Sequence, residues 1–186
     1  IRSLENSRSF NDFNFIVNED GSFYYKDKFG GLNLPMPNIL GQFQLENIST
    51  AIATIKTLNI DIKNEDIQKG VTRISSLGRL QEIKSGKLKE LVKYNKLLVD
   101  GSHNEDGARV LNKYLQNLDC RKHVVIGMMA NKQHEKYISY FKNISSVTVV
   151  DIPNQPNSIN GIELKKKFKN FKNVRYETNI LKEIKS

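Results

Sequence analysis

The chain has 186 residues, 38% of them hydrophobic and 26% charged, with a net charge of +9. This composition is typical of a folded protein rather than a disordered one, and no apolar run approaches the roughly 18 residues of a membrane helix. The single cysteine, Cys120, excludes an internal disulfide and fits a reducing compartment. Residues 1–6 lack the apolar core of a signal peptide. We therefore expect a cytoplasmic protein of one domain or slightly more, without membrane contact.

The positive charge is spread along the chain. Even the densest basic region, residues 163–186 with eight basic and three acidic side chains, lacks the arginine-aromatic pattern of nucleic-acid-binding modules. A basic protein can also bind small polyanions. The composition therefore disfavours a nucleic-acid partner and leaves small anionic ligands open.

The first part of the chain predicts a hairpin followed by helices. Strand-like runs at residues 13–17 and 23–26 flank an Asp-Gly turn signal. A short extended stretch follows at 32–34. The next segment predicts a helix, whose apolar stripe consists of Ile48, Ala51, Ile52, Ile55 and Leu58.

A linker follows this part of the chain. Asn64 can cap a short helix over residues 65–71. Residues 72–80 show no apolar period, which indicates a linker, and Arg79 lies within it. A lone arginine in a linker is usually solvated, yet its guanidinium is also the group best suited to phosphate.

From Leu80 onward, strands alternate with helices. We expect a possible hairpin near residues 85–87, strands at 97–99, 124–128, 147–152 and 174–176, and helices at 108–118, 137–141 and 162–168. This alternation predicts an α/β fold whose mostly parallel sheet has flanking helices and right-handed crossovers.

The stretch Asp100-Gly101-Ser102-His103-Asn104 joins the 97–99 strand to the next helix. Open α/β sheets bind ligands at the carboxyl ends of strands, and the free N–H groups of a helix start suit phosphate or carboxylate. The alternative is an ordinary turn with an Asn or Asp cap. The residues alone leave both interpretations open.

Several common sites are absent from the sequence. Neither Gly-x-Gly-x-x-Gly nor Gly-x-x-x-x-Gly-Lys-Ser/Thr occurs, and three scattered histidines with one cysteine give no metal-site spacing. Ser102 and His103 are sequence neighbours, so they do not define a catalytic triad. By themselves the residues support a non-catalytic nucleotide- or phosphate-binding α/β module.

Four motifs make the chain resemble a known family over nearly its whole length. They lie at residues 41–47 (Gly-Gln-Phe-Gln-Leu-Glu-Asn), 78–81 (Gly-Arg-Leu-Gln), 100–104 and 126–129 (Ile-Gly-Met-Met). Their order is that of the folylpolyglutamate synthase / dihydrofolate synthase branch of the Mur ligase superfamily. The corresponding family motifs read roughly Gly-x-His-Gln-x-x-Asn, Gly-Arg-Leu/Phe and Asp-Gly-Ala-His-Asn-Pro. The pair His103-Asn104 disfavours a peptidoglycan-type Mur ligase, which remains an alternative.

The resemblance implies a division of the chain. Residues 1–75 would be the C-terminal portion of a central ATP-binding domain, an incomplete piece containing its last strands and helix. Residues 76–186 would be a Mur ligase C-terminal domain with a Rossmann-like sheet, lacking its last strand and helix. The phosphate loop and the Mg²⁺ ligands are then expected upstream of residue 1, so the chain alone should be inactive. We expect a monomer.

The implied reaction is ATP-dependent amide bond formation in folate biosynthesis and one-carbon metabolism. ATP phosphorylates the carboxylate of dihydropteroate or (tetrahydro)folate to an acyl phosphate. The amine of L-glutamate then attacks it, and ADP and phosphate leave. ATP and Mg²⁺ are the implied cofactors. Such catalysis depends mainly on positioning and charge stabilisation.

The family's functional residues map onto this chain motif by motif. Asn47 would hold the adenine side of ATP, Arg79 would reach the phosphates, and Asp100 would accept hydrogen bonds from the ribose hydroxyls. His103 would be the catalytic residue, contacting nucleotide or incoming glutamate. Asn104 would join His103 in binding substrate, and none of these residues would bind metal.

The chain departs from the family pattern at several positions. Phe43 replaces the usual His, Glu105 replaces the Pro after His-Asn, and Asn131-Lys132-Gln133 stands for Asp-Lys-Asp. These changes bear on the choice of substrate more than on the reaction class, and no role is assigned to Lys132.

Overall fold

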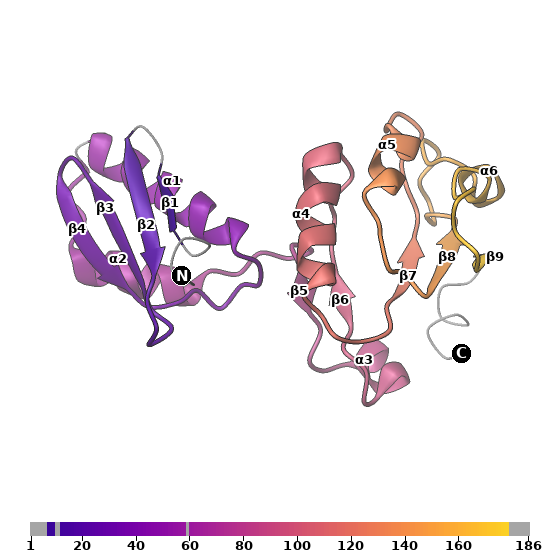
Figure 1. Cartoon of the computed structure of the whole chain (residues 1–186), viewed down its shortest axis with the longest axis horizontal. Helices are drawn as coiled ribbons and strands as arrows, with labels where there is room; N and C mark the ends of the chain where they lie inside the picture. Colours follow the sequence, from indigo (N-terminus) through magenta and orange to yellow (C-terminus); the bar gives the residue numbers. More distant parts are fainter. Residues whose placement is uncertain (1–6, 10–11, 59, 179–186) are drawn as a thin grey trace. The chain divides into compact units, whose positions relative to one another are not determined.

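In the computed structural model, which describes residues 7–9, 12–58 and 60–178, the chain forms two compact units, Ile1–Gln81 and Glu82–Ser186. Figure 1 shows their elements in chain order. Residues 1–6, which argued against a signal peptide, lie outside the described residues. Within the described ranges, no helix has the length and apolar character needed to cross a membrane.

A four-stranded antiparallel sheet forms the framework of the first unit. Its strands pair in chain order and are β1 (Ser7–Ser9), β2 (Phe13–Val17), β3 (Phe23–Asp27) and β4 (Gly30–Leu34). The turn between β2 and β3 closes through the Asn18 N–H, which donates to the Ser22 carbonyl at 2.9 Å, and Gly21 adopts a φ of 81°. This conformation suits glycine. The predicted hairpin is confirmed, and the stretch at 32–34 is part of a full strand.

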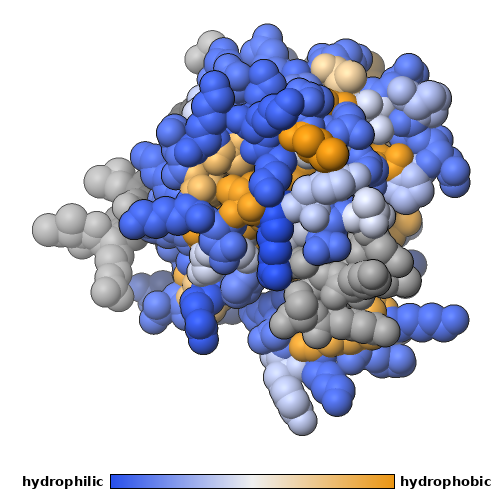
Figure 2. All heavy atoms as spheres, turned by 90° about the vertical axis from the view of Figure 1, so that its right-hand side faces the viewer, coloured by the Kyte–Doolittle hydropathy of each residue, from blue (hydrophilic) through white to orange (hydrophobic). Residues whose placement is uncertain are grey.

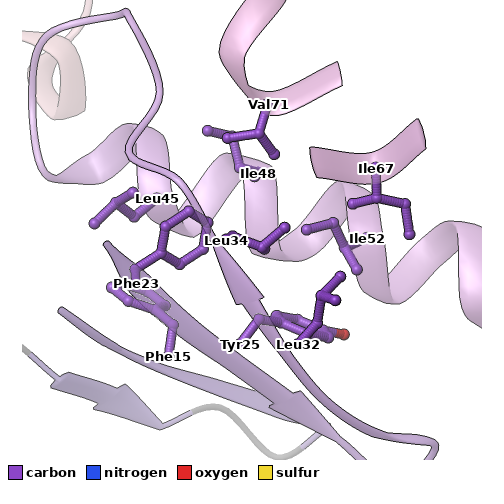
Figure 3. Packing of buried hydrophobic residues seen from close by; sticks show 10 residues of the cluster. All are labelled: Phe15, Phe23, Tyr25, Leu32, Leu34, Leu45, Ile48, Ile52, Ile67 and Val71. Carbon is purple, nitrogen blue, oxygen red and sulfur yellow. The ribbon is translucent and has the colours of Figure 1, made fainter. Parts of the chain in front are cut away.

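Helices α1 (Phe43–Thr57) and α2 (Asn64–Arg73) supply the other half of this unit's core. In Figure 3 their apolar side chains face those of β2, β3 and β4. The predicted stripe on α1 is partly wrong, because Ala51 is exposed and Leu58 is 65% exposed. The helix begins at Phe43 and ends at Thr57, so Leu45 joins Ile48 and Ile52 on the buried face and Leu58 lies beyond the last turn.

A polar contact fastens the last turn of α1 to β3. The Tyr25 hydroxyl donates to Asp27 Oδ2 at 2.7 Å, and Lys56 Nζ lies 3.7 Å from Asp27 Oδ1. The same ammonium lies 5.2 Å from the centroid of the Tyr25 ring. Burial is the main cause that raises the pKa of Tyr25, so its hydroxyl stays protonated and remains a donor.

The second unit contains a three-stranded parallel sheet in the order β7 (His123–Ile126), β8 (Ser146–Val150), β9 (Val174–Glu177). Every residue of the central strand β8 is buried. Helices α4 (Glu105–Gln116), α5 (His134–Ser139) and α6 (Gly161–Lys165) alternate with these strands. The predicted mixed α/β fold with parallel strands is confirmed for this part of the chain.

Two local predictions for this unit are wrong. Residues 85–87 do not form a hairpin, because helix α3 (Lys87–Val92) begins directly after Gly86. Its Lys, Leu and Glu residues are good helix formers. The strand predicted at 97–99 is β6 (Leu98–Val99), which pairs with β5 (Gln81–Glu82) in a separate two-stranded sheet. It is not a buried strand, since Val99 is 40% exposed.

Figure 2 shows the face of the second unit on which α6 and β9 lie. Hydrophilic side chains predominate there, and the hydrophobic ones form small separate areas. Some of the lysines in this region pair locally: Lys166 with Glu163 at 2.6 Å and Lys167 with Glu135 at 3.1 Å. The described portion of the predicted basic region is therefore a solvated surface whose charge is partly neutralised.

Asp151, directly after β8, ties the start of α6 to β9. Its Oδ1 accepts the Gly161 N–H at 2.7 Å, and its Oδ2 accepts the Tyr176 hydroxyl. A Cβ at Gly161 would lie 2.4 Å from the Tyr176 ring, so only glycine fits there without displacing that ring. These two hydrogen bonds, that of Tyr176 first, lower the pKa of Asp151 below its ordinary value of 3.8.

We expect Leu34→Ala to destabilise the first unit by about 2–5 kcal/mol, because Leu34 is 1% exposed and its removal leaves a cavity. The matched control is Leu77→Ala, the same truncation at a side chain that is 81% exposed. Its effect should stay within about 0.5 kcal/mol. Urea unfolding followed by circular dichroism measures both, and equal losses would contradict the core assignment.

We expect Asp151→Asn to weaken the second unit at neutral pH and to flatten its acid unfolding. Because the pKa of Asp151 is lowered in the folded state, its stabilisation is present above the ordinary value of 3.8. It is lost as the pH falls through the lowered pKa. Thermal unfolding between pH 7 and pH 2 measures this, with Asp61→Asn as an exposed control. A variant with the wild-type pH profile would rule the linkage out.

Candidate functional site

The loop between β6 and α4 is closed by its own hydrogen bonds. Asp100, directly after β6, is half-buried, and its Oδ1 accepts the Ser102 N–H at 2.9 Å. Asn104 is the N-cap of α4, with its Oδ1 accepting the Gly107 N–H at 2.9 Å. Asp100 thus follows a strand, as predicted, and the capping role that was the alternative for Asn104 is present.

His103 is exposed at the middle of this loop, and its Nδ1 lies 2.9 Å from the Gly101 carbonyl oxygen. A carbonyl oxygen only accepts, so Nδ1 carries the proton in this contact. In the neutral ring, Nε2 then holds the lone pair. Within the described residues, no hydrogen bond joins Ser102 to His103. The loop therefore presents an imidazole of defined tautomer to solvent.

The loop lies against the first turn of α4 at a position that only glycine fits. A Cβ at Gly107 would lie 2.5 Å from Ser102 Cβ and 3.1 Å from Asn104 Oδ1. These distances are shorter than ordinary van der Waals contact. Gly107 is therefore what lets the capping bond and the turn at Ser102 exist together.

The start of α4 is acidic. Glu105 and Asp106 occupy its first turn, where they suit the helix dipole. Asp106 pairs with Arg109 at 2.9 Å, and Glu105 pairs with Lys136 and accepts the Tyr140 hydroxyl. These partners, Lys136 first, lower the pKa of Glu105. The start of this helix already carries carboxylates, which argues against the anion site that the free N–H groups suggested.

Helix α5 contacts the loop through Tyr137, the first residue of the helix predicted at 137–141. The Tyr137 hydroxyl lies 3.0 Å from Ser102 Oγ, and Tyr137 is 4% exposed. Burial is the main cause that raises its pKa, so the hydroxyl stays protonated. A tyrosine among buried aliphatic positions usually has a hydrogen-bond partner, and this was the signal that could have identified the contact.

The two other residues predicted to bind nucleotide, Asn47 and Arg79, lie in the first unit. Asn47 is exposed on α1, and its Nδ2 donates to Gln44 Oε1 at 3.1 Å. Arg79 is exposed between Gly78, with a φ of 68°, and Leu80, which is 1% exposed with a φ of 44°. Within the described ranges Arg79 forms no ion pair. The buried Leu80 thus fixes the backbone next to Arg79, whose guanidinium is exposed and takes no part in the core.

Metal ligands are not gathered in the part of the chain that the structure describes. No group of three or more His, Cys, Asp or Glu side chains there could hold an ion. Lys132, in the segment after β7, is half-buried, and its N–H donates to the Met129 carbonyl at 3.4 Å. This contact gives Lys132 no chemical role.

We expect Gly107→Ala to destabilise the second unit although alanine favours helices, because its Cβ would force Ser102 and the capping amide apart. The cost should be about 1–3 kcal/mol. Gly70→Ala on α2 is the matched control, since a Cβ there meets nothing within 4 Å. It should stabilise by about 0.5–1 kcal/mol. Thermal unfolding of both variants is the measurement, and stabilisation by Gly107→Ala would contradict the close packing.

No protein-family model matches the chain. Among curated proteins, it is similar to the dihydrofolate synthase/folylpolyglutamate synthase of Haemophilus influenzae. The two are 27% identical over 103 residues, which cover 49% of this chain and 24% of that protein.

The fold is similar to three solved structures. The folylpolyglutamate synthase of Thermotoga maritima has a TM-score of 0.72 at 25% identity, covering 95% of this chain and 42% of that one. E. coli FolC in complex with ADP has a TM-score of 0.74 at 19% identity, covering 94% and 39%. A bifunctional folylpolyglutamate synthase/dihydrofolate synthase with Mn, AMPPNP and L-glutamate bound has a TM-score of 0.70 at 20% identity. That match covers 89% of this chain and 37% of that one.

The chain spans less than half the length of each of these proteins. The curated relative and the solved structures agree on the group of enzymes that the sequence motifs indicate. The predicted resemblance is confirmed: over part of their length, this chain is similar to folylpolyglutamate synthases and dihydrofolate synthases.

Proposed function

We propose that this chain is part of an ATP-dependent ligase that adds L-glutamate to dihydropteroate, to (tetrahydro)folate or to both. The observation that carries the proposal is the loop of Asp100, His103 and Asn104, which is closed by its own hydrogen bonds on a capped helix. Similarity to a FolC structure with ADP, and to a synthase structure with Mn, AMPPNP and L-glutamate, supports it. Residues 1–75 would then belong to the ATP-binding domain and 76–186 to the C-terminal domain of a cytoplasmic monomer.

The proposed nucleotide contacts follow from the chemistry of three side chains. Asp100 can accept ribose hydroxyls in addition to the Ser102 N–H, because a carboxylate has about four acceptor positions. Arg79 offers five N–H donors in a planar arrangement suited to phosphate oxygens. Asn47 donates to Gln44 through Nδ2, so its Oδ1 can accept from the adenine amino group.

His103 and Asn104 are proposed to face the glutamate and the acyl group. The Nδ1 contact with Gly101 leaves Nε2 of His103 to accept a proton from the attacking ammonium, or to donate to an oxyanion once protonated. The cap uses Oδ1 of Asn104, so its Nδ2 is the group that can donate to substrate. Bound ATP and Mg²⁺ would supply the phosphoryl group and neutralise its charge.

One observation favours a second candidate, a nucleotide- or phosphate-binding α/β module without catalysis. Asn104 caps α4, so the loop geometry alone also fits an ordinary strand-to-helix turn. The experiment that separates the two measures ADP release by the full-length protein with dihydropteroate or tetrahydrofolate, with and without L-glutamate. Release that requires both pterin and glutamate supports the ligase. Nucleotide binding without such turnover supports the module.

We expect Arg79→Ala and Asp100→Asn each to lower ATP binding or turnover by about 10- to 150-fold, the effect of one hydrogen bond to a charged group. Arg79→Ala should lower kcat more than ATP affinity if its contact forms only in the closed complex. Asp100→Asn keeps the shape of the side chain and should leave the melting temperature close to that of wild type.

The matched controls are Arg73→Ala and Asp119→Asn, which change the same residue types at exposed positions. Both should keep wild-type kinetics. ATP affinity by calorimetry, turnover and melting temperature are measured for all four variants in the full-length protein. Wild-type kinetics in the Arg79 and Asp100 variants would eliminate their assignment, and a loss of activity that follows a loss of stability would favour a structural role.

A further inference from the structure

We propose that helix α5 positions His103 by holding the loop on both sides of it, through Tyr137 at Ser102 and through Lys136 and Tyr140 at Glu105. The part of this proposal that concerns substrate rests on the function proposed for His103 above. The part that concerns the loop stands on the contacts themselves.

On the N-terminal side of His103, the contact is neutral and shielded. Ser102 Oγ lies 3.0 Å from the hydroxyl of Tyr137, whose ring packs against Phe141 with a centroid distance of 5.3 Å. Tyr137 belongs to the buried cluster of this unit. The packed ring leaves its hydroxyl little freedom to move, so the hydrogen bond fixes Ser102 relative to the core rather than to another surface group.

On the C-terminal side, the contact is charged. Both carboxylate oxygens of Glu105 are used, one by the Tyr140 hydroxyl and the other by Lys136 Nζ. Helix α5 contains Lys136 and Tyr137, and its C-cap is Tyr140. One short helix therefore reaches the residue before His103 and the second residue after it.

These contacts occur at two positions where the chain departs from the family pattern Asp-Gly-Ala-His-Asn-Pro that it resembles. Alanine at position 102 has no hydroxyl for a tyrosine, and proline at position 105 has no carboxylate. A proline restricts the backbone through its ring, whereas Glu105 is restricted by partners on a neighbouring helix.

The contacts at Ser102 and Glu105 restrict the loop on either side of the His103 imidazole. The His103 ring is exposed, and among the described residues its hydrogen-bond partner is the Gly101 carbonyl, a group of the same loop. The orientation of Nε2 therefore depends on whether residues 101–105 keep their backbone conformation. Catalytic groups need to be held close to their productive geometry, and here the holding residues lie on α5.

The test uses the full-length protein labelled with ¹³C and ¹⁵N histidine. Ring nitrogen and carbon shifts, at a pH where the imidazole is neutral, report the fraction of His103 with the proton on Nδ1. A His103→Gln spectrum assigns the signals. Hydrogen exchange of the Ser102 and Gly107 amides, both bonded within the loop, reports how often the loop opens.

We expect Tyr137→Phe to lower the Nδ1-protonated fraction and to speed exchange of both amides by roughly 2- to 10-fold, the effect of one hydrogen bond. Phenylalanine keeps the ring in the core. Ser102→Ala removes the same bond from the exposed side and should give the same change, and the double variant should add nothing further. Tyr114→Phe on α4 is the matched control, since the Tyr114 hydroxyl makes no hydrogen bond within the described residues, and it should behave as wild type.

Unchanged His103 shifts and exchange rates in both Tyr137→Phe and Ser102→Ala would overturn the proposal, whether or not the protein is a ligase. If ligase activity is present, the two variants should lower kcat while the KM for ATP stays within about twofold, because ATP would bind through other residues. If ligase activity is absent, the spectra still decide the positioning role, so its failure is distinguishable from failure of the proposed function.

Discussion

The hydrogen bond from the Gly107 N–H to Asn104 Oδ1 is the contact on which the candidate loop depends. It ends the extended backbone at Asn104 and starts α4, which places Ala108 in the core. Farther along the same helix, Asn112 Oδ1 accepts the Lys142 N–H at 3.1 Å and ties α4 to the segment after α5. Asn104 directly follows His103, so the same cap restricts the backbone beside the imidazole. The cap therefore sets both the packing of the unit and the direction of the imidazole.

The elements that local patterns determine were predicted from the sequence. Alternation and the Asp-Gly turn gave the hairpin of β2 and β3, and the continuous apolar run gave β8. The predictions that were wrong depend on neighbours far away in the chain. Residues 97–99 are apolar enough for a buried strand, yet Leu98–Val99 pairs with Gln81–Glu82 instead of joining the parallel sheet. An apolar run alone does not specify which strand lies beside it.

The same distinction applies to the candidate site. The motif indicated Asp100, His103 and Asn104, which the structure places in one loop, and the sequence alone already allowed Asn104 to be a cap. The contacts of Tyr137 with Ser102 and of Tyr140 with Glu105 join residues 35 positions apart. The spacing of residues within a helix or a strand cannot predict contacts between residues so far apart in the sequence. Tyr137 served equally well as a member of an apolar stripe, and only the fold shows that its hydroxyl has a partner.

The charges around the loop also bear on the proposed nucleotide contacts. Two carboxylates in the first turn of α4 stabilise its dipole, but they repel an anion at the same place. Arg109 and Lys136 are already paired with those carboxylates, so they compensate charge locally rather than provide an open cationic surface. Arg79 differs because the buried Leu80 fixes the adjoining backbone while its guanidinium stays exposed. In the proposed function, Asp100 is therefore the acceptor for hydroxyl groups, and Arg79 rather than the start of α4 is the cation proposed for phosphate.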